Sequence, residues 1–174
     1  MKILLHICCG PCAVYPLKNE LKDYTEVCGF FYNPNIHPYQ EYLKRLEAVN
    51  FLAEEIKIKM FYKDEYEMRE FLSHIANNVD NRCQYCYSSR LEATAIEARY
   101  RRFDAFSSSL LYSKYQEHEL IKTIGESMGE IHGVPFLYRD FRAGWKKGIE
   151  LSKEMGLYRQ QYCGCIYSEE ERYK

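Results

Sequence analysis

Short apolar runs alternate with longer amphipathic segments along the chain. The apolar runs predict five strands, at residues 2–7, 25–32, 56–61, 103–107 and 134–138. The first run is almost entirely apolar and indicates a buried strand, whereas residues 56–61 alternate apolar side chains with lysine and suit a strand near a sheet edge. The segments between the runs carry apolar residues at helical spacing, which predicts helices between successive strands.

Capping and helix-breaking residues predict where these helices begin and end. Pro11 opens a helix that runs to about Lys22, and the breaker-rich stretch 33–38 precedes a strongly amphipathic helix. Further helices are predicted around residues 68–79, after Cys86 to about residue 99, around residues 120–131, and from about residue 143 to residue 155, before Gly156. The alternation predicts a single α/β domain over residues 1–174, with about five parallel strands, flanking helices and right-handed crossovers. Only the charged tail, residues 168–174, is expected to fray.

Composition narrows the class of protein. The chain has 174 residues, of which 47% are hydrophobic and 28% charged, and its net charge is −1. These values are ordinary for a soluble globular domain and exclude coating of nucleic acid through bulk charge, while a local basic patch remains compatible. No apolar run approaches the roughly 20 residues of a membrane span, and the N-terminal run is too short for a signal peptide. We therefore expect a cytoplasmic protein with no membrane contact.

Cysteines are the strongest chemical signal in the chain. Seven of the eight fall into three close sets: Cys8, Cys9 and Cys12; Cys83 and Cys86; Cys163 and Cys165. Because the cytoplasm keeps thiols reduced, such sets indicate metal ligands or redox groups rather than disulfides. Seven thiolates exceed the four that one zinc or one 4Fe–4S cluster accepts, and spacing alone leaves iron–sulfur and zinc both open. The eighth, Cys28, lies in a predicted strand, and we interpret it as a core residue.

Two other interpretations apply to the first cysteine set. Cys9-Gly-Pro-Cys12 is a thioredoxin-type motif between a strand and a helix, where a low-pKa thiolate would exchange disulfides. Against this, another cysteine precedes the motif and two further sets share the chain. A phosphate-binding loop would also suit this position, but Gly10 is its only glycine and no GxGxxG motif occurs, so ATP chemistry is not expected. A zinc-stabilised RNA-binding module stays a further alternative.

Polar groups follow the last two predicted strands. Residues 107–109 with Tyr112, Lys114, Tyr115 and Gln116 follow the fourth strand, and Arg139, Asp140 and Arg142 follow the fifth. Ligands of open parallel sheets gather beyond the carboxyl ends of the strands, so we expect these loops and the cysteine sets to converge there. Asp140 would either cap a helix and pair with an arginine, or serve as an oxygen ligand to iron or a proton donor.

Five stretches carry a family resemblance that covers nearly the whole chain. They are His6-Ile-Cys-Cys-Gly-Pro-Cys12, Cys83-Gln-Tyr-Cys86, Ser107-Ser-Ser-Leu-Leu111 with Ser113-Lys-Tyr-Gln-Glu-His-Glu-Leu-Ile121, Tyr138-Arg-Asp-Phe-Arg142, and Leu157-Tyr-Arg-Gln-Gln-Tyr-Cys-Gly-Cys165. The combination is specific, because a double cysteine near the N-terminus rarely occurs together with a terminal Cys-Gly-Cys. In these stretches the chain resembles the cobalamin-independent epoxyqueuosine reductases, the QueH family.

The resemblance implies a fold, a substrate and cofactors. The fold would be of the HUP, adenine nucleotide α-hydrolase-like type, with cysteines in place of the ATP loop. The partners would be tRNA that carries epoxyqueuosine at the wobble position of a GUN anticodon and an external electron donor. The reaction would be two-electron reductive deoxygenation to queuosine. The cofactors would be a 4Fe–4S cluster and a neighbouring mononuclear iron, held by cysteine and aspartate.

The resemblance implies a set of site residues, without assigning each one to a particular metal. The expected cluster ligands are Cys9, Cys12, Cys83, Cys86 and Cys163. The expected catalytic groups are Asp140, Cys8 and Cys165, and all eight residues are candidate metal ligands. Which sulfur binds which metal is left open.

Overall fold

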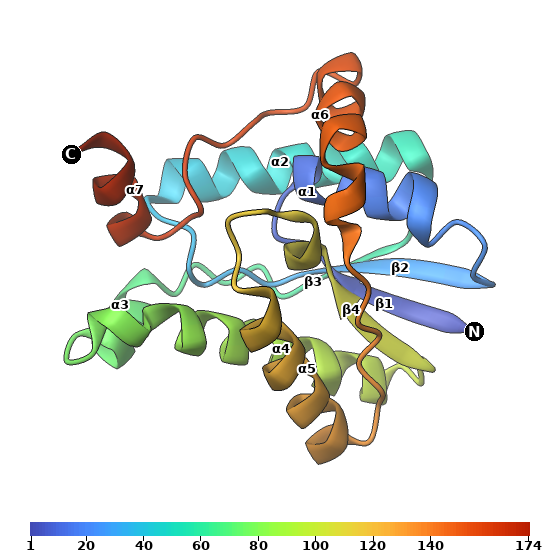
Figure 1. The fold of residues 1–174 in the computed structure, drawn as a ribbon, viewed down its shortest axis with the longest axis horizontal. Helices are drawn as coiled ribbons and strands as arrows, with labels where there is room; N and C mark the ends of the chain where they lie inside the picture. The colour runs from blue at the N-terminus through green and yellow to red at the C-terminus, as the bar shows by residue number, and fades with distance from the viewer.

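Four parallel strands form the centre of the molecule, seen in a computed structural model that describes residues 1–174 (Figure 1). They are β1 (Lys2–His6), β2 (Glu26–Phe31), β3 (Met60–Tyr62) and β4 (Ala105–Ser108), arranged in the order β3-β2-β1-β4. β1 is buried from its second residue onward, as a central strand covered on both faces should be. The predicted edge position of the third strand is confirmed.

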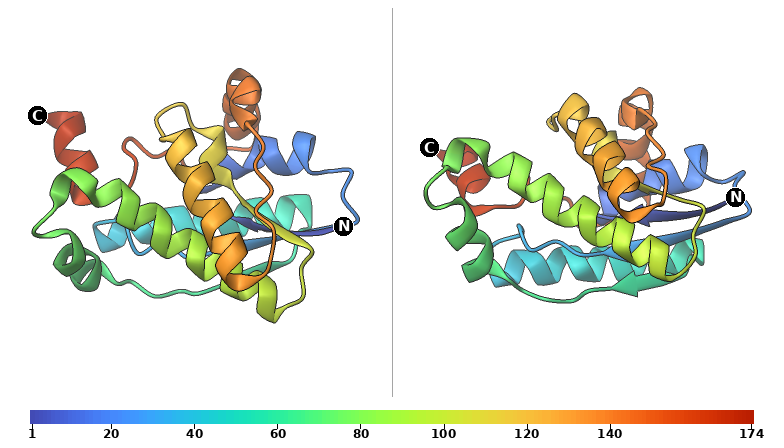
Figure 2. Two further views of the ribbon diagram at one scale, coloured as in Figure 1. Left: turned by 60° about the horizontal axis from the view of Figure 1, so that its bottom comes forward. Right: turned by 90° about the horizontal axis from the view of Figure 1, so that it is seen from below.

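Helices cover both faces of this sheet (Figures 1 and 2). One side carries α1 (Gly10–Tyr15), α2 (Tyr39–Ile56) and α6 (Trp145–Glu154), and the other carries α4 (Arg82–Tyr100) and α5 (His118–His132). The short helices α3 (Met68–Ile75) and α7 (Ile166–Tyr173) lie beyond one end of the sheet, beside the C-terminus. The predicted α/β class with a parallel sheet and flanking helices is confirmed.

In the sheet, β2 and β3 lie on one side of β1 and β4 lies on the other. The chain connections therefore diverge between β1 and β4, and the carboxyl ends of these two strands lie side by side. The backbone N–H of Cys8, just after β1, donates to Oγ of Ser109, just after β4, at 3.0 Å. His6 Nδ1 and Ser108 Oγ, the last side chains of the same strands, lie 2.9 Å apart. Such a topological switch point is where open α/β sheets bind ligands.

The predicted fifth strand is wrong. Residues 134–138 make one isolated parallel bridge, between Phe136 and Phe106. The Phe106 N–H donates to the Pro135 carbonyl oxygen at 3.0 Å, and the Leu137 N–H donates to the Phe106 carbonyl oxygen at 2.7 Å. Pro135 has no N–H to donate. At the other end the Leu137 carbonyl accepts from the Ser107 hydroxyl, at 2.8 Å, instead of extending a backbone ladder. The sheet therefore has four strands rather than five.

Two boundaries differ from the sequence predictions near the site. Cys83 and Cys86 were expected before a helix, but α4 begins at Arg82, so both lie in its first two turns. The charged residues 168–174, expected to fray, lie almost entirely in α7. Arg82 pairs with Glu171 and so ties α7 to the start of α4.

Two apolar clusters support this end of the fold. The larger one contains apolar side chains of β1, β2 and the inward faces of the helices, together with Cys9, Cys12 and the predicted core residue Cys28. A smaller cluster joins Phe71 and Ile75 of α3 to Cys86 of α4 and to Cys165 before α7. The second and third cysteine sets are thus brought together by packing, although some 80 residues separate them in sequence.

Candidate metal and substrate site

The first cysteine set forms a compact turn between β1 and α1. The chain leaves β1 at His6 and enters α1 at Gly10, where an added Cβ would lie 3.2 Å from the carbonyl oxygen of Ala48 in α2. Glycine therefore lets the turn lie against α2. The sulfur atoms of Cys8, Cys9 and Cys12 all lie within 4.8 Å of one another. Three sulfur atoms at this spacing can share one metal ion or one face of a cluster.

Side chains from distant segments donate hydrogen bonds to these sulfur atoms. Ser109 Oγ donates to Cys8 Sγ at 3.3 Å, and Gln160 Nε2 lies 2.8 Å from Cys9 Sγ and 3.7 Å from Cys12 Sγ. Hydrogen bonds of this kind orient metal-binding sulfurs, and they are one of the factors that set the reduction potential of an iron–sulfur cluster.

The protonation of the turn favours a single thiolate. Hydrogen bonds from the Cys12 and Cys9 thiols hold the pKa of Cys8 well below its ordinary value. Burial raises the pKa of Cys9, and hydrogen bonding to Cys8 raises the pKa of Cys12. Cys9 is buried, so the nucleophile that a thioredoxin-type motif needs is neither exposed nor acidic. This geometry disfavours the disulfide-exchange interpretation.

The other four cysteines are gathered more loosely. Cys86 and Cys165 are buried, Cys83 is half-buried and Cys163 is exposed. The first set is the only group of three or more potential ligands whose donor atoms lie within 4.8 Å of one another. Burial raises the pKa of Cys86 to about 12. Metal binding to this second group would have to replace its thiol protons and draw its sulfurs together.

A cavity of about 860 Å³ opens beside the cysteine turn. Cys8, Cys12 and Cys163 line one part of it, and the aromatic residues Tyr112, Tyr115 and Trp145 line another. Arginine and glutamine side chains complete its wall: Arg45, Arg90, Arg159, Gln116, Gln160 and Gln161. The loop after the fourth strand thus meets the first and third cysteine sets as predicted, whereas Arg139, Asp140 and Arg142, which were expected there as well, do not line the cavity.

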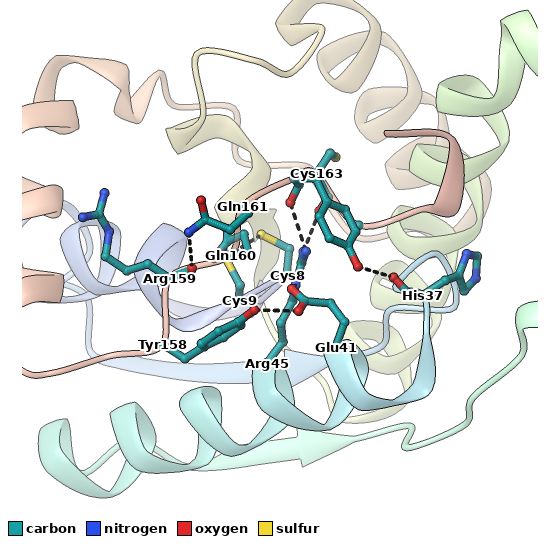
Figure 3. Close-up of polar contacts among 12 residues, drawn as sticks. Cys8, Cys9, His37, Glu41, Arg45, Tyr158, Arg159, Gln160, Gln161 and Cys163 are labelled. Atoms are coloured by element: carbon teal, nitrogen blue, oxygen red, sulfur yellow. Dashed lines mark hydrogen bonds and ion pairs between the residues drawn. The ribbon is translucent and has the colours of Figure 1, made fainter. Parts of the chain in front are cut away.

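The C-terminal segment that carries Cys163 is held over the turn by α2 (Figure 3). Arg45 of α2 donates to the carbonyl oxygens of Tyr162 at 3.0 Å and Cys163 at 2.5 Å, and it pairs with Glu41 at 2.8 Å. Glu41 also accepts from the Tyr158 hydroxyl at 2.6 Å. An added Cβ at Gly164 would lie 2.8 Å from Asn35 Nδ2, so only glycine fits there without displacing a neighbour.

Asp140 lies apart from the cysteines. It caps the short helical turn Phe141–Gly144 and binds the Arg142 guanidinium, with Oδ2 2.6 Å from Nη2. This pairing lowers the pKa of Asp140 to about 2. Its Oδ1 lies 4.0 Å from Nδ1 of His118, and it does not line the cavity. The structure therefore shows the capping and pairing role, and ligation of iron by Asp140 stays a prediction.

Three site residues were missed from the sequence: Arg45, Arg90 and Gln160. Both arginines interrupt an apolar stripe at helical spacing, Arg45 between Tyr42 and Val49 and Arg90 next to Leu91. A charged residue inside a buried stripe is a usable signal, because charges are almost never fully buried unless they are paired. Gln160 lies in a loop, and the only signal for it was its place in the stretch from Leu157 to Cys165 that carries the family resemblance.

Fold and site together define a parallel α/β protein with a cluster of three cysteines, spaced so that they could hold a metal, at its topological switch point. Solved structures share the fold. One is described as a predicted subunit of tRNA methyltransferase from Methanocaldococcus jannaschii (TM-score 0.58, 12% identity, 88% of this chain and 76% of that one). Another is the U34-tRNA thiolase NcsA from Methanococcus maripaludis with its [4Fe-4S] cluster (TM-score 0.61, 14% identity, 97% and 61%). At these identities the likeness shows the fold alone.

Sequence comparison gives the family. The family model described as Epoxyqueuosine reductase QueH matches residues 3–171. Relatives of that name include one from Dehalococcoides mccartyi, 40% identical over 99% of this chain and 94% of its own length, and one from Thermotoga maritima, 39% identical over 98% and 91%. The chain belongs to the epoxyqueuosine reductase QueH family, so the resemblance is confirmed, and it is an oxidoreductase of queuosine biosynthesis. None of its helices is long and apolar enough to cross a membrane.

Proposed function

We propose that this protein removes the epoxide oxygen of epoxyqueuosine at the wobble position of a tRNA with a GUN anticodon. The epoxide takes up two electrons and two protons, both C–O bonds break, and the products are the alkene of queuosine and one water molecule. Family membership supports the reaction. The electrons would come from an external donor.

The observation that carries the proposal is the cavity shared by thiols and aromatic rings. Its volume of about 860 Å³ suits a modified nucleoside, since small-molecule sites are commonly about 300–1,000 Å³. Unstacked RNA bases are recognised by stacking on aromatic side chains, and Tyr115 and Trp145 present such rings at 5.8 Å centroid separation. A base stacked there would face the wall that carries Cys8, Cys12 and Cys163.

The cysteines fit an iron–sulfur cofactor by the chemistry of their donor set. The first cysteine set (Cys8, Cys9 and Cys12) would bind the metal centre through three sulfurs. The remaining sulfur ligands would come from the other two sets, Cys83 and Cys86 and Cys163 and Cys165, and Asp140 is the proposed oxygen ligand. When bound, a 4Fe–4S cluster would supply electrons one at a time, and a neighbouring iron would act as a Lewis acid on the epoxide oxygen.

The chain's own residues have separable tasks in this proposal. Ser109 and Gln160 orient sulfur atoms of the turn. Arg45 holds the segment that closes the cavity and brings Cys163 to it. Arg159 and Arg172 lie on the cavity wall, where they can bind the phosphates that flank the extruded nucleotide.

Anaerobic preparation followed by iron and acid-labile sulfide analysis tests the proposal. We expect a brown protein whose visible absorbance bleaches with dithionite and which converts epoxyqueuosine to queuosine in isolated tRNA. A colourless protein that carries only zinc and binds RNA without turnover would support the RNA-binding module instead. Disulfide exchange that survives replacement of Cys83 and Cys86 by serine, without iron, would support the oxidoreductase alternative.

A further inference from the structure

Arg90 is a buried charge without a carboxylate partner. Its side chain lies inside the protein at 1% exposure, one helical turn after Cys86 on α4. Nε donates to the Cys86 carbonyl oxygen at 3.0 Å, and Nη2 lies 2.9 Å from the Cys86 sulfur. No aspartate or glutamate lies within ion-pair distance. The guanidinium makes no other hydrogen bond within the protein, and its Cζ lies 5.9 Å from the centre of the Tyr87 ring.

Arg45 shows how this protein normally accommodates a buried arginine. It is equally buried, at 2% exposure, yet it pairs with Glu41 and donates to two backbone carbonyls. Burial of an unpaired charge is strongly unfavourable, so a guanidinium kept inside a fold is normally balanced by an anion. Because no carboxylate of the protein pairs with Arg90, an anion of another kind must balance its charge.

The surroundings of Arg90 indicate which anion that is. The thiols of Cys86, Cys163 and Cys8 and the Tyr87 hydroxyl act, when ionised, to raise the pKa of Arg90 against the effect of its burial, and burial and Arg90 together lower the pKa of His6. Each of these cysteines comes from a different one of the three sets. Arg90 also lines the cavity that Cys8 and Cys163 line. The guanidinium therefore contacts a sulfur of the second set and shares a cavity with one cysteine of the first set and one of the third.

We propose that Arg90 is the internal counterion of the metal centre, whose positive charge balances the thiolates that metal binding creates. The inference rests on the proposed metal centre and adds a role for this residue. Metal binding converts thiols to thiolates and releases their protons. A fixed positive charge beside them favours both the binding and any later gain of an electron, because each one-electron reduction adds one negative charge. Arg90 is thus a positioning and tuning residue that need not touch the substrate.

Reduction potential is the first test. Arg90→Met removes the charge at similar length, Arg90→Lys keeps it, and Arg99→Met removes an exposed charge from the same helix as a control. In dithionite titrations of the reconstituted protein, we expect Arg90→Met to lower the equilibrium constant for one-electron reduction about tenfold, a shift of about 59 mV to more negative potential. Arg90→Lys should restore most of the shift, and Arg99→Met should leave the potential unchanged.

A second test needs no iron. Co²⁺ bound to thiolates gives sulfur-to-metal absorbance, so its affinity can be titrated in the metal-free protein. We expect Arg90→Met to bind Co²⁺ about tenfold more weakly and, without metal, to resist urea at least as well as the unaltered chain, because it no longer buries an unpaired charge.

Three outcomes would overturn the role of Arg90. The first is a metal-free Arg90→Met protein that unfolds much more easily, with unchanged cobalt affinity and potential, since that describes a purely structural arginine. The second is unchanged potential and cobalt affinity with weakened tRNA binding, since that makes Arg90 a phosphate ligand. The third is an Arg90→Lys variant whose reduction potential and cobalt affinity are no closer to those of the unaltered protein than those of Arg90→Met. Failure of the unaltered protein to take up iron would refute the proposed cofactor, while the cobalt titration would still test Arg90.

Discussion

At the scale of single residues, side chains of similar type have different tasks according to their exposure. Tyr112 is buried, stacks on Trp145 with ring centroids 5.2 Å apart and donates its hydroxyl to the Trp145 carbonyl. Tyr115 is 84% exposed and meets the same indole edge-on. Packing therefore explains Tyr112 completely, whereas Tyr115 has a free ring face beside the cavity.

Replacement of Tyr115 by alanine should weaken substrate binding without affecting the fold. Base stacking on an aromatic side chain contributes about 1–3 kcal/mol, so we expect KM for the tRNA substrate to rise by about fivefold or more with little change in thermal stability. Tyr115→Phe should retain stacking. Tyr100→Ala is the matched control, because Tyr100 is 77% exposed and lies at the end of α4 outside this cavity. An equal rise in KM for both alanine variants would contradict the assignment.

Asp140 allows a second prediction at this scale. If it ligates iron during turnover, Asp140→Ala should abolish epoxide reduction, lower the iron content and leave tRNA binding intact, as measured by single-turnover assay, metal analysis and filter binding. The side chain is partly exposed and its Arg142 pair contributes little to stability, so the variant should fold. Full turnover by Asp140→Ala would remove this residue from the site.

At the scale of elements, α2 does more than cover the sheet. Its buried Glu41–Arg45 pair reaches across to residues 158–163, which close the cavity (Figure 3). The pair joins the middle of the chain to the segment that carries Cys163. Its hydrogen bonds to Tyr158, Tyr162 and Cys163 hold this loop against α2.

Glu41→Gln should loosen this segment. Loss of one partner leaves the Arg45 charge buried and uncompensated, which costs about 3–5 kcal/mol in such pairs, so the free energy of unfolding in urea should fall by roughly that amount. Cys163 should also react faster with a thiol-specific alkylating reagent. Glu47→Gln, an exposed change on the same helix, is the control and should alter neither measurement. Unchanged stability of Glu41→Gln would show that the pair does not hold the segment.

At the scale of the whole molecule, the cysteine sets join three parts of the chain at one end of the sheet. They come from the turn after β1, the start of α4 and the segment before α7. A metal centre that binds all three would cross-link the fold, because ligands that bind only the native state stabilise it. The chain would then gain part of its stability from metal.

Metal removal should therefore lower the melting temperature. We expect the anaerobically loaded protein to melt several degrees above the chelated protein in calorimetry, since about 1 kcal/mol corresponds to roughly 2–4 °C in a domain near this size. Cys86→Ala should reduce both iron content and this difference. Cys28→Ala, a buried cysteine in β2 outside the sets, should reduce neither. Equal melting of the loaded and chelated proteins would contradict a cross-linking centre.

The sequence alone determined the order of strands and helices, the cysteine turn after the first strand and the family. Each of these is encoded locally, by periodicity, by turn residues or by motif spacing. The number of strands was not encoded in this way. Residues 134–138 are as apolar as a strand, but Pro135 has no N–H to donate and the Leu137 carbonyl accepts from the Ser107 hydroxyl, so the ladder stops at one bridge.

Only the tertiary structure decided which charges and sulfurs meet at the opening cysteine turn. The sequence alone does not show what Arg45 and Arg90 contact. Arg45 donates to the carbonyl oxygens of residues 162 and 163, and Arg90 lines a cavity together with Cys8 and Cys163. Cys86 and Cys165 come together because α3, α4 and α7 pack into one apolar cluster. Such contacts join distant parts of the chain, so spacing cannot specify them, and the environment of the metal ligands is set by the folded protein.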